Sequence, residues 1–270
     1  MSALAKTAAF VRRDFLEDAS YRFAFLGQAA GMLVSALTFY FIGRVFGGAV
    51  ASYLQPYGGD YFAFALVGIA FAGFQNVALE GFATSVRNAQ MMGTLEALLV
   101  TPTSIPVIIL SSVTYRLAYM VLRTSLYLAM GVVVFGVDLG RANYLGGLVV
   151  LVLTLASFSS AGILAAAAVM VFKRGDPVEF LFGNASRVFS GVFFPVAVFP
   201  GWLQRVAWAL PLTHALEGMR RTLLMGASLP SIAGSLLYLV LFSLISLPIS
   251  IVLFRYAVAN AKVNGTLVHY

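Results

Sequence analysis

Tyr144 to Phe172 reads YLGGLVVLVLTLASFSSAGILAAAAVMVF, and none of these residues is charged. A helix needs about 20 apolar residues to cross the hydrocarbon core of a bilayer, and this stretch is longer than that. Further apolar stretches lie on both sides of it. They run over residues 23–43, 61–79, 105–137, 178–198 and 232–254. The sequence therefore predicts an all-α integral membrane protein with six transmembrane helices.

The composition of the chain agrees with this prediction. The chain has 270 residues, of which 61% are hydrophobic and 10% are charged, and its mean hydropathy is +0.94. An average soluble domain is about 45–50% apolar and about 25% charged, so a water-soluble fold of this length would not hide so much apolar surface. The sequence contains no cysteine, which excludes a disulfide framework, a thiolate metal site and a cysteine nucleophile.

The distribution of lysine and arginine predicts the orientation of the spans. With six spans, both termini share one side of the membrane with the second-to-third and fourth-to-fifth connections. The flanking cations of that side are Lys6, Arg12, Arg13, Arg22, Arg87, Lys173, Arg174, Arg255 and Lys262, and those of the other side are Arg44, Arg141, Arg205, Arg220 and Arg221. Cytoplasmic segments are the richer in Lys and Arg, so both termini are predicted to be cytoplasmic. The net charge of +7 is assigned to contacts with anionic headgroups of the lipid bilayer, and no nucleic-acid partner is predicted.

Residues 1–22 are predicted to form an amphipathic helix in the cytoplasmic membrane interface. On a helical wheel, one face carries apolar side chains and the opposite face carries charged ones. The apolar face holds Leu4, Ala8, Val11 and Phe15, and the charged face holds Lys6, Arg13 and Glu17. The segment has no continuous apolar core and no small-residue cleavage site, unlike a signal peptide. A frayed polar tail is the alternative.

The charged residues inside the predicted spans are all arginines, namely Arg116, Arg123 and Arg187. A charge in hydrocarbon is costly and usually functional. No Asp or Glu lies in the middle of a predicted span, since Glu80 and Glu179 stand at span ends. Ion-coupled carriers usually need a midplane carboxylate or broken helices in paired halves. A secondary carrier or channel is therefore a less favoured class of protein. It is not excluded, because backbone carbonyls can also form ion sites.

Arg116 and Arg123 are seven residues apart and share one helical face, with Tyr119 and Tyr127 close to it. One interpretation is that this face lines a cavity that meets anionic or aromatic cargo. The other is that Arg116 reaches the cytoplasmic headgroups while Arg123 pairs with a neighbouring helix. We favour the second interpretation.

A membrane-embedded enzyme is a third class. Intramembrane hydrolysis or transfer needs a nucleophile with a base, or paired carboxylates. His214 and Glu217 are three residues apart after Pro211 and would meet on one helical face. A helix start with local hydrogen bonds is the simpler interpretation of these residues.

Two segments are not simple spans. The connection 81–106 contains an amphipathic stretch that ends at Pro102, which needs either a groove on a soluble partner or the membrane interface to pack on. The segment 190–220 is apolar but is interrupted by Pro195, Pro200 and Pro211. It is predicted to turn near residues 195–200 and to continue as short helices that fold back into the outer leaflet.

These two segments carry a resemblance to a known family. The sequences GTLEALLVTP at 93–102, SGVFFP at 190–195 and LPLTHALEGMR at 210–220 resemble the type-2 ABC transporter permeases. This class comprises the transmembrane subunits of bacterial drug, antibiotic, lipid and polysaccharide exporters. The likeness covers nearly the whole chain, including the interfacial N-terminal helix, the six spans and the order of the loops.

The resemblance implies a bacterial inner-membrane exporter built from two permease copies, as a homodimer, and two copies of a separate ABC ATPase subunit. Residues 87–101 would be the cytoplasmic coupling helix that docks on the ATPase. The coupling residues would be Arg87, Gly93, Thr94, Leu95, Glu96, Leu98, Leu99, Thr101 and Pro102. The chain lacks the G-x-x-x-x-G-K-[ST] phosphate loop, so ATP and Mg would bind in the partner subunit, and no cofactor is predicted in this chain.

The resemblance also implies roles within the membrane. Gly27 and Gly31 of the first span would lie at the dimer interface, where small residues permit close helix contact. The cargo path would be lined by Arg116, Tyr119, Arg123, Phe193 and Phe194. The extracellular gate would be formed by Pro195, Pro200, Trp202, Pro211, His214 and Glu217. No catalytic residue and no metal site are predicted.

Overall fold

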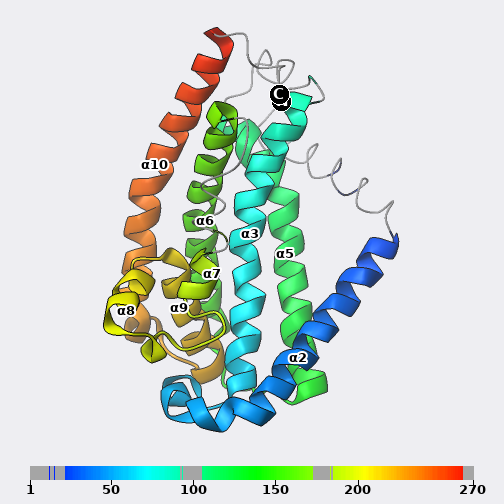
Figure 1. Cartoon of the computed structure of the whole chain (residues 1–270), viewed down its shortest axis with the longest axis vertical. Coiled ribbons are helices and arrows are strands. Elements are labelled where there is room, and N and C mark those ends of the chain that lie inside the picture. The colour runs from blue at the N-terminus through cyan, green and yellow to red at the C-terminus, as the bar shows by residue number, and fades with distance from the viewer. Residues whose placement is uncertain are drawn as a thin grey trace.

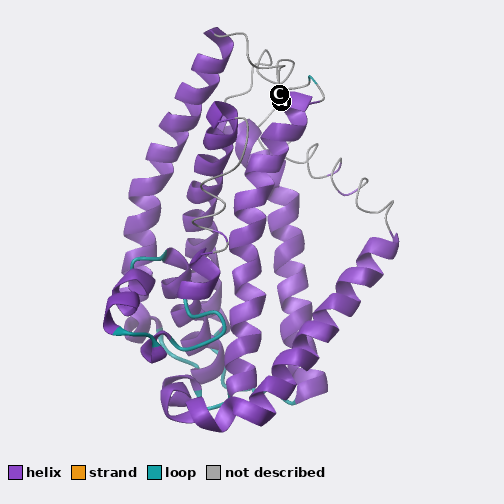
Figure 2. Ribbon diagram, viewed as in Figure 1, coloured by secondary structure: helices purple, strands orange, loops and turns teal. Residues whose placement is uncertain are grey.

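The computed structural model describes residues 22–91, 93, 105–172, 183 and 185–263, together with residues 12 and 15. All elements of this described part are helices (Figures 1 and 2). The long ones are α2 (Arg22–Leu54), α3 (Tyr61–Met91), α5 (Ile105–Phe135), α6 (Tyr144–Phe172) and α10 (Ala233–Val263). The short ones are η1 (Gln55–Tyr57), α7 (Ser186–Phe189), η3 (Val196–Val198), α8 (Gly201–Trp208), α9 (Pro211–Met225) and η4 (Leu229–Ile232).

Five of the described helices are long and apolar enough to cross a membrane. They are α2, α3, α5, α6 and the helix that ends the described part, α10. Each has 29 to 33 residues, which gives a length of about 44–50 Å, more than the roughly 30 Å of a hydrocarbon core. The prediction of an all-α integral membrane protein is therefore confirmed, whereas the number of six spans stays a prediction.

Helix α3 forms the centre of the bundle. It packs against α2, α5, α6 and α9, and its Phe64, Phe74 and Phe82 side chains are fully buried. Helices α2 and α10 lie at the edges (Figure 1) and keep many large apolar side chains exposed, such as Phe41 and Leu244. Exposed apolar side chains of this kind are expected where a helix faces lipid. The bundle is thus ordered around α3, with its outer helices available to the membrane.

Helices α6 and α10 run in the same direction and are joined by serine hydroxyls. Ser157 bonds Ser243 at 2.9 Å, and Ser160 bonds Ser246 at 2.6 Å. Both pairs have the same sequence separation of 86 residues, as parallel helices require. The predicted fifth span and folded-back helices fall between Phe172 and Ala233, and they would provide the return that two parallel helices need.

Removing one hydroxyl of this pair should weaken the α6–α10 contact measurably. We expect Ser160→Ala to lower the free energy of unfolding by about 1 kcal/mol, because a hydrogen bond between transmembrane helices is lost. Ser125→Ala is the matched control, since its exposed hydroxyl donates to the carbonyl of Val121 in its own helix. Thermal unfolding in detergent measures both. A double-mutant cycle with Ser246→Ala that gives zero coupling energy would contradict the predicted contact.

Several helices extend beyond the predicted membrane spans by a few turns. The first and second spans continue to Leu54 and Met91, and the sixth continues to Val263. Arg87 to Met91 consequently belong to α3, and the coupling role of residues 87–101 stays a prediction. Gly93, which adopts a left-handed φ of +65°, follows this end, as glycine commonly does after a helix. Apolar patterning marks the membrane-embedded part only, and polar residues such as Glu80 and Asn88 continue the helix beyond it.

The fifth predicted span falls partly outside the described residues. Of its described part, only α7 is α-helical, and it ends at Phe189 rather than near Pro195. Gly191 explains this earlier end, because its φ of +79° lies in the left-handed region that glycine tolerates. The predicted short helices after the span are α8 and α9, and Pro211 stands in the first turn of α9, where its missing N–H costs nothing.

Candidate functional site

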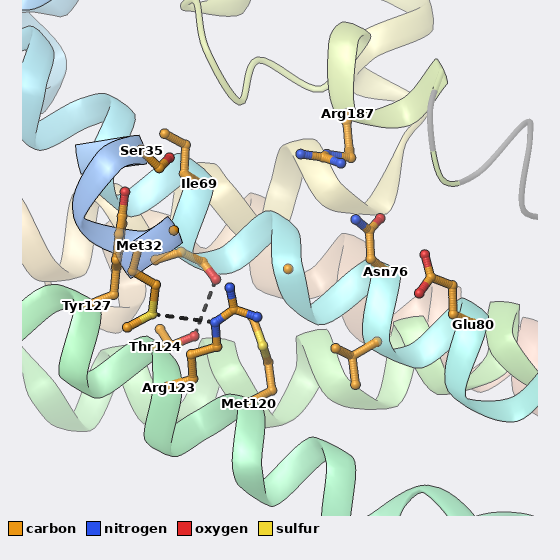
Figure 3. A pocket seen from close by; sticks show the side chains of 14 residues that line it. Met32, Ser35, Ile69, Asn76, Glu80, Met120, Arg123, Thr124, Tyr127 and Arg187 are labelled. Atoms are coloured by element: carbon orange, nitrogen blue, oxygen red, sulfur yellow. Dashed lines mark hydrogen bonds between the residues drawn. The ribbon is translucent and has the colours of Figure 1, made fainter. Parts of the chain in front are cut away.

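A cavity of about 350 Å³ lies between α2, α3, α5 and α7. Figure 3 shows the labelled side chains of these four helices around it. Its apolar and small lining residues are Gly31, Met32, Ile69, Ala70, Gly73, Val77 and Met120. Its polar lining residues are Ser35, Asn76, Glu80, Arg123, Thr124, Tyr127 and Arg187. The size falls within the range of about 300–1,000 Å³ that is typical of small-molecule sites.

Arg123 projects into the cavity from α5. It lies about 18 Å along the helix from Phe135, so it is near the middle of a membrane-spanning stretch. The neighbouring Thr124 is buried and donates to the carbonyl of Ala70 on α3 at 3.3 Å, which fixes this part of α5. The Nε of Arg123 is 3.5 Å from the Met32 sulfur. In a typical ion pair, the partner of an arginine is a carboxylate. The Nε of Arg123 instead meets the sulfur of Met32, which is a weak acceptor.

Arg187 reaches the cavity from α7, on the side opposite Arg123 (Figure 3). The preceding residue, Ser186, is buried and donates to the side-chain oxygen of Gln75 at 3.2 Å. This bond attaches α7 to the middle of α3, next to Asn76. The Nε of Arg187 is buried and has no hydrogen-bond partner among the described residues. Buried donors of this kind are uncommon and call for an explanation.

Glu80 also lines the cavity. The sequence placed it at the end of a span, and α3 itself continues beyond it to Met91. Glu80 lies about 28 Å along α3 from Tyr61, so it is inside the helix but near the far edge of a hydrocarbon core of about 30 Å. The cavity therefore has a carboxylate at its Met91 end and arginines nearer its middle.

The other predicted cargo-path residues lie elsewhere. Arg116 is not among the cavity-lining residues, and Tyr119 donates to Gln28 of α2 at 3.0 Å. Arg116 is about 28 Å along α5 from Phe135, the depth at which an arginine reaches the headgroups. Phe193 stacks on Phe39 of α2 with ring centroids 5.5 Å apart, and Phe194 is half exposed. The structure therefore brings together Arg123 and Arg187, a pair that the sequence did not associate.

Arg220 forms a second polar cluster that the sequence did not predict. Its side chain is 3% exposed. It donates to the carbonyls of Phe64 at 3.1 Å, Gly191 at 2.9 Å and Val192 at 2.8 Å, and its guanidinium stacks 3.4 Å from the centre of the Phe64 ring. Burial lowers the pKa of Arg220 to about 9, so the group stays cationic at neutral pH. Arg220 thus fastens the non-helical turn after α7 to α3 and α9.

Gly68 provides the space for this cluster. A Cβ atom at this position would lie 2.3 Å from the carbonyl oxygen of Val192 and 2.4 Å from a terminal nitrogen of Arg220. Only a residue without a side chain permits such an approach. Non-helical backbone inside a membrane protein must find hydrogen bonds within the protein, and the guanidinium supplies them here. The only sequence signal was the proline-interrupted segment itself, which implied that such donors had to exist.

The predicted gate residues occupy this same region. Glu217 accepts a hydrogen bond from Tyr57 at 2.5 Å and lies 3.7 Å from Nε of Arg221. His214 bonds the carbonyl of Trp208 at 2.9 Å and stacks on Tyr238 at 3.9 Å between ring centroids. Burial lowers the pKa of His214, so the ring is neutral at pH 7. His214 and Glu217 are therefore engaged separately, and their contacts give no support to an acid–base pair.

The remaining gate and interface residues differ in exposure. Pro195 and Pro211 are buried, whereas Pro200 and Trp202 are exposed. Gly31 lines the cavity, and Gly27 has open space around it in the single chain. Most of the predicted interfacial helix and the coupling residues Thr94, Leu95, Glu96, Leu98, Leu99, Thr101 and Pro102 lie outside the described residues.

Comparison with protein families identifies the chain. The family model for the ABC-2 type transporter matches residues 6–224, which include α2, the cavity helices and the Arg220 cluster. A comparison with curated proteins finds no match. The match covers well over half of the chain and agrees with the helical membrane fold. The protein therefore belongs to the ABC-2 type transporter family, as a membrane-embedded transporter subunit.

Proposed function

We propose that the chain is the permease subunit of an ATP-driven exporter. It moves an amphipathic or lipid-like cargo, such as a drug, an antibiotic, a glycolipid or a polysaccharide, out of the cytoplasm or the inner leaflet. The observation that carries this proposal is the cavity at Arg123 and Arg187, a polar chamber inside an apolar bundle. Intramembrane charges that face a protein cavity commonly mark a substrate pathway.

Helix α3 connects the cavity with the segment that is proposed to dock on the ATPase. It lines the cavity through residues from Ile69 to Glu80 and continues to Met91, within the proposed coupling segment at 87–101. A displacement of that segment therefore acts on a helix that forms one wall of the cavity. ATP and Mg bind in two copies of a separate ABC ATPase, because this chain lacks a phosphate loop. A second permease copy completes the membrane unit as a homodimer.

The coupling segment offers a direct test. We expect the combined change Glu96→Ala and Leu98→Ala to reduce cargo-stimulated ATP hydrolysis of the complex about tenfold or more, because the coupling segment loses the side chains that dock on the ATPase. Leu145→Ala is the control, since this exposed residue lies in the first turn of α6. Unchanged complex formation and hydrolysis in the double variant would refute the docking role.

A secondary carrier is the second candidate function, and Glu80 is the observation that favours it. A carboxylate that lines an intramembrane cavity is a common feature of proton- or cation-coupled carriers. The two functions differ in their energy source. Transport by the chain alone, driven by an imposed proton or sodium gradient and lost in Glu80→Gln, would establish the carrier and exclude the ATP-driven exporter.

A further inference from the structure

We propose that the cavity binds the phosphate or carboxylate group of an anionic amphiphile between Arg123 and Arg187. This inference rests on the proposed transport function and specifies the chemistry of its cargo. The two arginines reach one cavity from α5 and α7, on opposite sides (Figure 3). They are far apart in sequence, so only the fold brings their charges together.

The charges of the described residues that line the cavity favour an anion. Neither arginine is within 4.0 Å of a carboxylate in the described part of the chain, where the Glu217 carboxylate is already engaged by Arg221 and Tyr57. Among the described residues that line the cavity are two arginines and one glutamate, which is an excess of one positive charge in that part of the lining. An uncompensated charge at this depth is costly. A bound anion removes that cost, which is the source of its affinity.

An unsatisfied donor is also present at the cavity. The Nε of Arg187 is buried without a hydrogen-bond partner among the described residues, and Arg187 lines the cavity. Asn76 of α3 also lines the cavity and adds an amide donor. Phosphate and carboxylate oxygens accept from such groups, and the planar guanidinium matches their geometry. The donor set is therefore complementary to an oxyanion rather than to a cation.

The position of Glu80 orients the ligand. It follows Asn76 by one helical turn toward Met91 and repels an anion from that end of the cavity. The oxyanion is thereby confined to the part between Arg123 and Arg187. The apolar lining, which includes Met32, Ile69 and Met120, suits a hydrocarbon chain, because methionine adapts to irregular shapes. An anionic headgroup with an attached chain satisfies both parts of the cavity.

Binding to the purified full chain tests this site without any ATPase. The probe is dodecyl phosphate in a neutral maltoside detergent, compared with dodecyltrimethylammonium and with inorganic phosphate, by calorimetry and by the shift in Tm. Dodecyl phosphate should bind most tightly. Arg123→Gln and Arg187→Gln should each weaken it about tenfold or more, since each removes a charged hydrogen bond. Arg116→Gln is the matched control on α5 and should change the affinity less than about twofold.

The outcomes of this experiment distinguish an anionic amphiphile from free phosphate as the ligand. They also test the binding site separately from ATP-driven transport. Equal affinity for inorganic phosphate would overturn the amphiphile assignment, and equal affinity for the ammonium amphiphile would overturn the anion site. An equal loss in Arg116→Gln would overturn the assignment to this cavity. Arg123→Lys keeps the charge and should lose less affinity than Arg123→Gln, which provides a folded variant if the glutamine form is unstable. Because this binding experiment involves no ATP, a negative result does not contradict ATP-driven transport. Likewise, a failure of ATP-driven transport would not contradict the anion site.

Discussion

Replacing Arg220 with methionine should destabilise the protein by about 3–5 kcal/mol, a size that is typical for the removal of one partner from a buried charged network. Methionine fills a similar volume but donates no hydrogen bond. The carbonyls of Gly191 and Val192 would then lose their guanidinium donors in a region that water does not reach. The turn after α7 would detach from α3, and the gate region would lose its anchor.

Arg221 provides the matched control for this prediction. It is adjacent in sequence, but its side chain is 39% exposed and its ion pair with Glu217 is 3.7 Å long. Arg221→Met should therefore cost less than about 1 kcal/mol. Thermal unfolding in detergent, followed by size-exclusion chromatography, compares the two variants. Equal Tm values for Arg220→Met and the wild type would contradict the anchoring role.

Gly68→Ala should have the second-largest effect, a loss of about 2 kcal/mol or more, because overpacking a filled site is costly. The added methyl group overlaps the backbone of Val192 and the terminal nitrogen of Arg220, and neither can move without breaking the bond between them. In an open helical position the same change would stabilise the helix by up to about 1 kcal/mol. The expected sign is thus opposite to that of helix propensity.

Gly234→Ala on α10 measures the propensity effect alone, because a Cβ at Gly234 meets open space. It should leave the Tm unchanged or raise it. Since Gly68 and Arg220 act on the same turn, the variant that combines Gly68→Ala with Arg220→Met should be less destabilised than the sum of the two. Strict additivity of the two losses would show that the residues do not share one site.

Those parts of the fold that depend on apolar content could be predicted from the sequence. The uncharged stretch at Tyr144–Phe172 is one helix with the predicted bounds, and the membrane class follows from it. Helix ends were predicted less well. Glu80 and Arg87 carry no signal that separates a polar helix extension from a loop, and only Gly93 marks the end of α3.

The candidate site depended on tertiary contacts and was predicted only in part. Arg123 was a candidate because charges inside spans are rare, and it does line the cavity. Its association with Arg187 depends on the bond between Ser186 and Gln75, which no spacing reveals. Arg220 could not be identified from the sequence for the same reason. It and Arg221 are adjacent arginines, and the helical rotation between them buries Arg220 and exposes Arg221.

Transport in sealed vesicles tests the central proposal, that this chain moves cargo only when another subunit hydrolyses ATP. The vesicles contain the permease, its partner ATPase and a fluorescent anionic lipid, and the signal is the movement of that lipid between leaflets. We predict movement with ATP and Mg, and its loss when the ATPase is inactivated by substitution or left out. Movement at an unchanged rate without the ATPase would contradict the proposal and identify the chain as a carrier or a channel.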